Sequence, residues 1–267
     1  MVTLDNLTVS YRQHPALHHV SGQFDAGSLT AVVGPNGSGK STLLKSIMGL
    51  LPASGGQLTL SNAAARIAYL PQVAEIERHF PIDVRDCVLL GCWPIKRAWG
   101  SVDGAALQRV DAALQDVGLQ GFEHRPIRSL SSGQLQRVLF ARLLVQNADL
   151  ILLDEPFNAI DSKTTAALLA IIARWHAERR TVLVVLHNDA QVQQYFPQTL
   201  LLAREVIAWG PTPSVMTAAN LSAARAMAEA WDDNADLCGR DALAASPLLN
   251  TATAPLTEPA RLAELAA

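Results

Sequence analysis

The stretch GPNGSGKST, residues 34–42, constrains the fold of this chain more than any other feature. Gly34, Gly39, Lys40 and Ser41 complete the pattern G-x-x-x-x-G-K-[ST]. An apolar segment, LTAVVG, precedes it, and KSTLLKSIMGLL follows with the pattern of a helix. An ordinary glycine-rich turn would not require the full match together with this context. The stretch therefore predicts a phosphate-binding loop between a buried strand and a helix.

Each residue type in this loop suits phosphate chemistry. The glycines allow backbone N–H groups to converge on phosphate oxygens. Lys40 is expected to reach the β- and γ-phosphates, and the Ser41 hydroxyl to bind Mg²⁺. The expected nucleotide-binding residues of the loop are Gly34, Pro35, Asn36, Gly37, Ser38, Gly39, Lys40, Ser41 and Thr42.

Composition sets broad limits on the 267-residue chain, which could form one large domain or two small ones. Hydrophobic residues make up 49% of it, yet its longest apolar runs have the length of buried strands. We expect no membrane span and, with Asp5 near the start, no secretory signal. A net charge of −3 gives no electrostatic reason to expect nucleic acid as a partner. Three cysteines make no disulfide framework, which favours a cytosolic protein.

The order of apolar segments predicts an α/β fold. Strand-like runs alternate with helical ones, which indicates a parallel sheet covered by helices on both faces. Strand signals vanish over about residues 73–140, so we expect an inserted helical subdomain there. We assign residues 1–224 to the main domain. Residues 225–267 are predicted to be a partly disordered extension, because their composition shows no clear period.

A second polar cluster ends the buried strand in LILLDEP. Asp154 is placed to hold Mg²⁺, and Glu155 to act as a general base for an attacking water. Because side chains alternate along a strand, both carboxylates cannot face one metal from regular β geometry, so one must lie on the turn. A solvated acidic turn is the alternative interpretation.

A third segment, LSSGQLQRVLFARLL, residues 130–144, predicts a helix that begins at a Ser-Ser-Gly sequence. The free N–H groups of such a helix start can bind an anion. One domain would then carry two phosphate-seeking helix starts, far apart in the sequence.

Together these segments resemble the ATP-binding subunits of ABC transporters, and LSSGQ resembles the signature motif of that family. The resemblance implies a P-loop NTPase core with a parallel sheet, an antiparallel β subdomain and an inserted helical subdomain. It also implies a head-to-tail dimer, in which the signature helix of one copy contacts the ATP held by the other. Ser131, Gly133 and Gln134 would make that contact, although Ser132 replaces a glycine of the usual LSGGQ.

The same resemblance assigns roles to residues elsewhere in the chain. Tyr11 would stack on adenine, although an edge-strand tyrosine is the plainer interpretation. Gln72 matches the Q-loop glutamine, which touches Mg²⁺ or the lytic water. Asp161 matches the D-loop aspartate, in NAID, where Asn158 departs from the commoner SALD. His187 matches the switch histidine that contacts the γ-phosphate. The implied catalytic set is Glu155, His187 and Gln72, and the implied Mg²⁺ set is Ser41, Gln72 and Asp154.

The resemblance also implies partners and a location. One set of motifs requires a second copy of the chain, and the lack of a membrane span requires separate permease subunits. We expect the permease to contact about residues 73–100, and an extracytoplasmic solute-binding protein to act indirectly. The chain would work at the cytoplasmic face of the inner membrane. The segment FPIDVRDCVLLG resembles the ATPases of zinc and manganese importers, and more distantly those of iron-chelate importers.

Two clusters of potential metal ligands allow a different interpretation. They are His14, His18 and His19 in HPALHH, and His79, Cys87 and Cys92 further on. Their spacing does not match the usual paired ligands, so we interpret them as a surface loop and as core packing. A soluble non-transport ABC protein and a small-molecule kinase remain alternatives for the chain as a whole. The kinase, however, would not explain LSSGQ or His187.

Overall fold

The computed structural model describes residues 2–11, 14–62, 65–72, 77–92, 102–158 and 160–229. All of these belong to one compact unit, residues 1–233. The predicted C-terminal extension lies outside the described residues from position 230 onward. Within the described ranges, no helix is long and apolar enough to cross a membrane.

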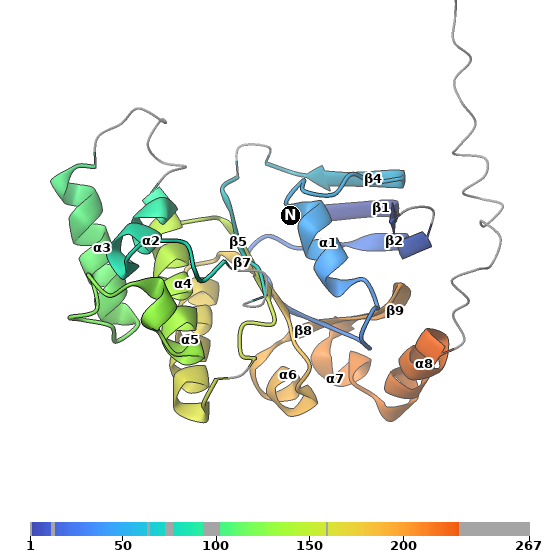
Figure 1. Ribbon diagram of the computed structural model, residues 1–267. Coiled ribbons are helices and arrows are strands. Elements are labelled where there is room, and N and C mark those ends of the chain that lie inside the picture. Colours follow the sequence, from blue (N-terminus) through green and yellow to red (C-terminus); the bar gives the residue numbers. More distant parts are fainter. Residues whose placement is uncertain are drawn as a thin grey trace, which may run out of the picture. The chain divides into compact units, whose positions relative to one another are not determined.

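A six-stranded sheet in the order β5-β6-β7-β3-β8-β9 forms the centre of this unit (Figure 1). The first five strands run parallel and β9 is antiparallel to β8. Every residue of β3, β6 and β7 is buried, as expected for strands covered on both faces. The strands are β3 (Leu29–Val33), β5 (Ile67–Leu70), β6 (Leu150–Asp154), β7 (Thr181–Val185), β8 (Gln198–Ala203) and β9 (Glu205–Pro211).

A smaller antiparallel sheet in the order β2-β1-β4 packs with α1 (Lys40–Ile47) over one face of the central sheet. Its strands are β1 (Val2–Tyr11), β2 (His14–Phe24) and β4 (Gly55–Leu60). Our interpretation of HPALHH as a surface loop is wrong, because these residues begin β2 and pair with β1. The strand was missed because its buried residues Leu17, Val20 and Phe24 do not alternate.

The opposite face of the sheet is covered by the helices of the inserted segment and by α5. They are α2 (Val84–Leu89), α3 (Gly104–Asp116), α4 (Ser132–Gln146) and α5 (Ser162–Ala177), with short 3₁₀ turns η2 (Leu90–Cys92) and η3 (Ile127–Ser129). Figure 1 shows them gathered on the side away from β1, β2 and β4. Helix α4 continues past residue 140, where we placed the end of the helical subdomain. Rings of Phe140 and Trp175 stack with centroids 5.8 Å apart and join α4 to α5.

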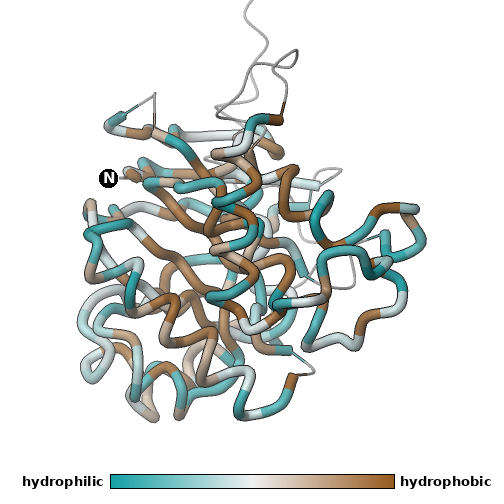
Figure 2. The backbone as a smooth tube through the Cα atoms, turned by 90° about the vertical axis from the view of Figure 1, so that its left-hand side faces the viewer, coloured by the Kyte–Doolittle hydropathy of each residue, from teal (hydrophilic) through white to brown (hydrophobic). Residues whose placement is uncertain are grey.

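Three further helices follow β7: α6 (Asp189–Tyr195), α7 (Thr212–Val215) and α8 (Ala218–Glu229). Helix α8 packs against β8 and β9. Figure 2 shows the apolar stretches running through the interior of the unit and the hydrophilic ones near its periphery. This distribution matches two apolar cores, one on each face of the central sheet.

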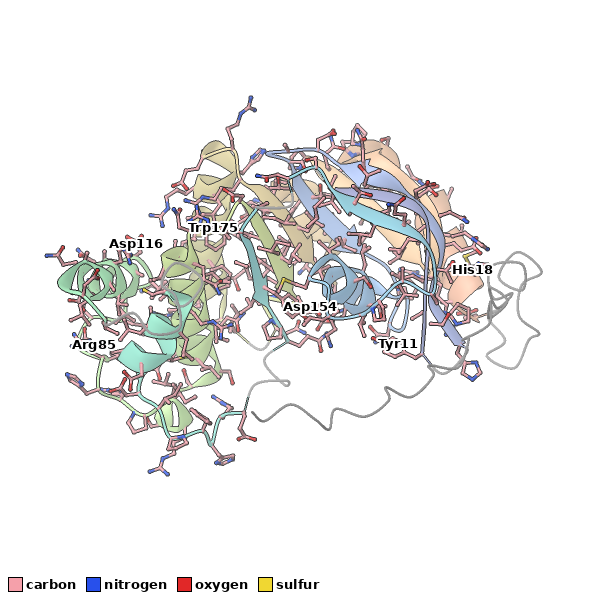
Figure 3. All side chains as sticks on the ribbon, turned by 90° about the horizontal axis from the view of Figure 1, so that it is seen from above. Tyr11, His18, Arg85, Asp116, Asp154 and Trp175 are labelled. Atoms are coloured by element: carbon pink, nitrogen blue, oxygen red, sulfur yellow. The ribbon has the colours of Figure 1, made fainter. Side chains whose placement is uncertain are left out.

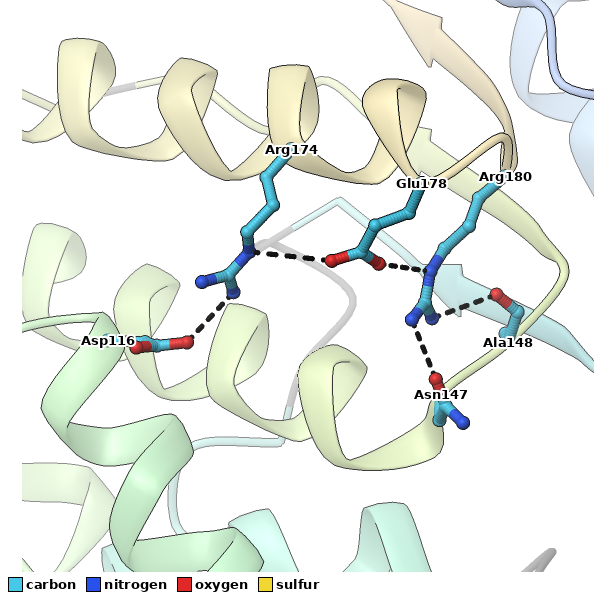
Figure 4. A network of polar contacts seen from close by, with 6 residues as sticks. All are labelled: Asp116, Asn147, Ala148, Arg174, Glu178 and Arg180. Carbon is cyan, nitrogen blue, oxygen red and sulfur yellow. Dashed lines mark hydrogen bonds and ion pairs between the residues drawn. The ribbon is translucent and has the colours of Figure 1, made fainter.

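A chain of polar contacts joins the carboxyl ends of α3, α4 and α5 (Figure 4). Arg174 lies 2.8 Å from Asp116 and also contacts Glu178, which pairs with Arg180 at 2.8 Å. Arg180 then donates to the Asn147 side chain at 2.7 Å. Guanidinium groups suit helix carboxyl ends, where carbonyl groups concentrate negative charge. Because most of these groups are partly exposed, the network fixes geometry more than it adds stability.

Candidate active site

A cleft of about 810 Å³ opens where β3, β6 and β7 end. Carboxyl ends of parallel strands meet at one edge of a sheet, so the loops that follow these strands converge there. The cleft is lined by Ala16, Asn36, Gly37, Ser38, Gly39, Lys40, Ser41, Thr42, Gln72, Glu155, Asn158 and His187. The structure thus brings together the predicted phosphate loop, Gln72, Glu155 and His187.

The phosphate loop turns sharply into α1 at Gly39. This residue has φ 91°, in the left-handed region, and no side chain caps the helix that follows. A Cβ at Gly39 would lie 2.3 Å from the carbonyl oxygen of Ala16. Only glycine fits this position, both for its conformation and for the close approach of the backbone. The turn directs the start of α1 toward the cleft, as an anion site requires.

Lys40 lies beneath the loop, with only 6% of its surface exposed. Its Nζ donates to the carbonyl oxygens of Gly34 and Pro35, at 2.9 and 2.7 Å, and to Ser38 Oγ at 3.3 Å. Burial lowers the pKa of Lys40, and the nearby carboxylates of Glu155 and Asp154 oppose that shift. The Lys40 ammonium group thus lies next to the loop, where phosphate oxygens would bind.

The two adjacent acidic residues occupy different backbone environments. Asp154 is the last residue of β6 and is fully buried, as Figure 3 shows by its interior place. The Tyr69 hydroxyl donates to its Oδ2 at 3.4 Å. Glu155 has φ 51° and therefore leaves the strand on a turn. The expectation that one carboxylate ends the strand and the other lies on the turn is confirmed.

Glu155 is the centre of a polar cluster in the cleft. Its Oε1 lies 2.6 Å from His187 Nε2, and its Oε2 accepts a hydrogen bond from the Asn158 amide. From the sequence we interpreted Asn158 only as a departure from a motif and did not predict this contact. Its position three residues after Glu155, at a turn, is the signal that could have indicated it.

Other predicted site residues do not line this cleft. Tyr11 lies at the end of β1 with 47% of its surface exposed, away from the interior (Figure 3). Ser131, Gly133 and Gln134 form the start of α4. There the Ser131 hydroxyl accepts from the Gln134 N–H at 3.2 Å, and the Gln134 side chain accepts from the Ser131 N–H at 3.0 Å. This reciprocal pair is a capping box and explains why the helix begins here.

Asp161 caps the neighbouring helix α5. It accepts from both the backbone N–H and the hydroxyl of Thr164, each at 2.8 Å, and these bonds lower the pKa of Asp161. A Cβ at Gly133 would lie 3.8 Å from Asp161 Oδ2, so the starts of α4 and α5 are adjacent. Apart from Tyr11, the predicted site residues therefore form two groups: one at the cleft and one at these two helix starts.

The two possible metal clusters do not form within the described parts of the chain, where no three His, Cys, Asp or Glu side chains are placed to hold a metal ion. His18 instead contacts Glu205 at 2.6 Å. Cys87 and Cys92 are free thiols buried in the core, which confirms the packing interpretation for them. Burial raises the pKa of the Cys87 thiol.

A family model described as ABC transporter matches residues 17–158. This chain belongs to the ABC transporter family. The match spans the phosphate loop, the start of α4 and the Asp154–Glu155 pair, so it includes members of both groups of site residues.

Named relatives cover most of the chain. The manganese transport system ATP-binding protein MntB of Listeria monocytogenes is 41% identical over 223 residues, which is 80% of this chain and 91% of that protein. The zinc transport system ATP-binding protein TroB of Treponema pallidum is 41% identical over 81% of this chain and 83% of its own length.

Solved structures show the same fold. One is an inward-facing conformation of an ABC transporter assigned to the metal-chelate type, with a TM-score of 0.75 and 28% identity over 84% of this chain and 88% of that one. Another is a dimeric bacterial ABC transporter cassette, with a TM-score of 0.72 and 27% identity over 79% of this chain and 99% of that one. The predicted fold class is confirmed.

Proposed function

We propose that this chain is the ATP-hydrolysing subunit of an ABC importer for a transition metal, most simply manganese or zinc. The observation that carries the proposal is the cleft in which the phosphate loop, Gln72, Glu155 and His187 converge. The relatives named for manganese and zinc transport support the cargo. Family membership supports ATP hydrolysis coupled to transport.

The phosphate loop would hold the ATP phosphates. Backbone N–H groups of residues 36–42, at the start of α1, would surround them, and Lys40 would exchange its contacts with loop oxygens for phosphate oxygens. Its partial desolvation strengthens that attraction, since charges interact more strongly away from water.

Three of the predicted site residues fit Mg²⁺. The fully buried Asp154 carboxylate, the Ser41 hydroxyl and the Gln72 side-chain oxygen are hard oxygen donors, which this ion prefers. When bound, Mg²⁺ would neutralise charge on the phosphates during phosphoryl transfer.

Glu155 would act as the general base. Its carboxylate would take a proton from water as the water oxygen bonds to the γ-phosphorus and the bond to the β–γ bridging oxygen breaks, giving ADP and phosphate. His187, 2.6 Å from Glu155, would contact the γ-phosphate. Gln72 would orient the water.

The second group of site residues would serve the nucleotide of another copy. Ser131 and Gly133 would contact its γ-phosphate, and Gln134 would help to bind the nucleotide. Asp161 would lie at the interface between the copies. Tyr11, exposed at the end of β1, would stack on the adenine of its own nucleotide. The similarity to a dimeric cassette supports this arrangement.

The permease would contact about residues 73–100, of which 77–92 are described, and an extracytoplasmic solute-binding protein would act through it. The chain would thus be held at the cytoplasmic face of the inner membrane. We further propose residues 1–224 as the ATPase domain and 225–267 as an extension.

The test is the elemental content of cells that lack this chain, grown under metal limitation. Complementation should use the native chain and, as a matched control, Glu155→Gln. Selective loss of manganese or zinc, restored only by the native chain, is expected. Loss of iron alone would favour the alternative, an iron-chelate importer. No change in any metal would contradict metal import and leave an importer of another substrate or a non-transport ABC protein.

A further inference from the structure

Asn158 is a polar residue of the cleft to which the proposed function assigns no role. It lines the cleft beside Glu155 and His187, and the same three residues line the adjoining hollow of about 570 Å³. Its side chain therefore lies at the point where two open spaces meet, next to the proposed general base.

The Glu155 carboxylate is held from two sides. His187 Nε2 lies 2.6 Å from one carboxylate oxygen, and the Asn158 amide donates to the other. Rotation about the terminal bond of glutamate is otherwise loosely restricted, so two anchors on two oxygens define the plane of the group. Each carboxylate oxygen can accept two hydrogen bonds, so each keeps room for a water molecule.

The backbone keeps Asn158 in reach of Glu155. The Asn158 N–H donates to the Glu155 carbonyl oxygen at 3.3 Å, which closes the turn that begins at φ 51°. Gln136, with 1% of its surface exposed, donates from Nε2 to the Pro156 carbonyl oxygen at 2.7 Å. Helix α4 thus braces the turn, and the amide of Asn158 is fixed relative to the carboxylate that it contacts.

We infer that Asn158 is a positioning residue, which orients the Glu155 carboxylate to take a proton from the attacking water. The inference rests on the proposed function, because it requires Glu155 to be the base. Without the amide, the carboxylate is anchored only by His187 and spends part of its time rotated away from the water. Loss of the amide should therefore lower the rate of ATP hydrolysis and leave the affinity for the nucleotide unchanged.

The first experiment compares ATP hydrolysis by Asn158→Leu, which is similar in size but has no donor, with the native chain. We expect kcat to fall about tenfold, as for a lost hydrogen bond to a charged group, with KM for ATP within about twofold. Asn158→Ser retains a donor and should recover most of kcat. Asn220→Leu is the control, because Asn220 makes a similar 2.9 Å amide bond, to Val215 in the α7–α8 region. It should leave kcat unchanged.

A double-mutant cycle separates positioning from a purely structural effect. In the Glu155→Gln background, adding Asn158→Leu should cause no further loss of the residual single-turnover rate. An unchanged kcat for Asn158→Leu, or the same tenfold loss in both backgrounds, would overturn the inference. If Glu155→Gln is inactive while Asn158→Leu is normal, only this inference fails. If Glu155→Gln keeps full turnover, the proposed base fails as well. Thermal midpoints of all variants establish that they fold.

Discussion

Two helices of this chain begin at short serine- and glycine-rich segments, yet their first turns are built differently. Helix α1 follows Gly39, which is left-handed and provides no side-chain cap. Helix α4 follows Ser131, whose hydroxyl forms a capping box with Gln134. The start of α1 thus requires glycine at position 39 for the fold of the chain itself. The start of α4 is stabilised by its capping box, and the fold of the chain does not require glycine at position 133.

This difference separates a residue that the fold requires from a residue that only a ligand would require. A Cβ at Gly39 would meet the backbone of Ala16 at 2.3 Å, whereas the nearest atom to a Cβ at Gly133 is 3.8 Å away. A small side chain therefore fits at Gly133 within one copy. If Gly133 matters, the reason must come from a molecule that approaches α4 from outside.

The largest effect is expected for Gly39→Ala. The left-handed conformation and the backbone clash should together cost about 2–4 kcal/mol of unfolding free energy. ATP binding should be lost, because the loop cannot keep its shape. Denaturant unfolding and nucleotide titration measure the two effects. Stability and binding both at native levels would contradict the described loop.

Gly133→Ala should give the opposite combination. Replacing glycine by alanine within a helix should raise stability by about 0.5–1 kcal/mol, since the side chain has room. ATP hydrolysis should fall about tenfold or more, because the added methyl group obstructs the approach of a partner's phosphate. Binding of ATP to the isolated chain should be unchanged. Native hydrolysis in this variant would show that nothing approaches Gly133.

Ser131→Ala should have an intermediate effect on both stability and ATP hydrolysis. Loss of the cap should cost about 1 kcal/mol of stability, and hydrolysis should fall several-fold. The matched control is Asp103→Ala, because Asp103 caps α3 through the Ala106 N–H at 2.8 Å, outside both groups of site residues. Both variants should lose similar stability, but only Ser131→Ala should lose hydrolysis. Equal rates of hydrolysis in the two variants would show that Ser131 acts only as a helix cap.

The smallest effect is expected for Ser132→Gly, which restores the commoner LSGGQ. Ser132 is the first residue of α4 and needs no side-chain contact for the capping box. Glycine there should cost no more than about 0.5–1 kcal/mol of stability and change hydrolysis by less than about threefold. A tenfold gain in phosphate release would show that Ser132 obstructs the ligand.

Local patterns predicted much of the fold. We predicted the phosphate loop, the buried strands and the start of α4 because each is formed by a short segment whose residues interact mainly with one another. Strand β2 was missed because register shifts in its pairing with β1 disrupt the alternation of buried residues. Strands β8 and β9, which we did not predict, complete the central sheet, since β8 pairs with β3 and β9 pairs with β8.

Much of the candidate site was also predicted from the sequence. Residues that carry a motif were found, and the structure gathers Lys40, Gln72, Glu155 and His187 in one cleft. The spacing of Asn158, three residues after Glu155 at a turn, could have indicated their contact but not its geometry, because that depends on Glu155 adopting φ 51°. Residues other than glycine seldom adopt this conformation, and no local pattern indicates where one will.

The start of α4 is proposed to contact the nucleotide of a second copy. The most direct test is the molar mass of Glu155→Gln with Mg²⁺ and ATP, measured by light scattering. We predict a dimer that retains ATP and that dissociates when ATP is omitted, with Gly133→Ala added to Glu155→Gln weakening the dimer about tenfold. A monomer with ATP bound, or a dimer equally strong with Gly133→Ala, would contradict the claim.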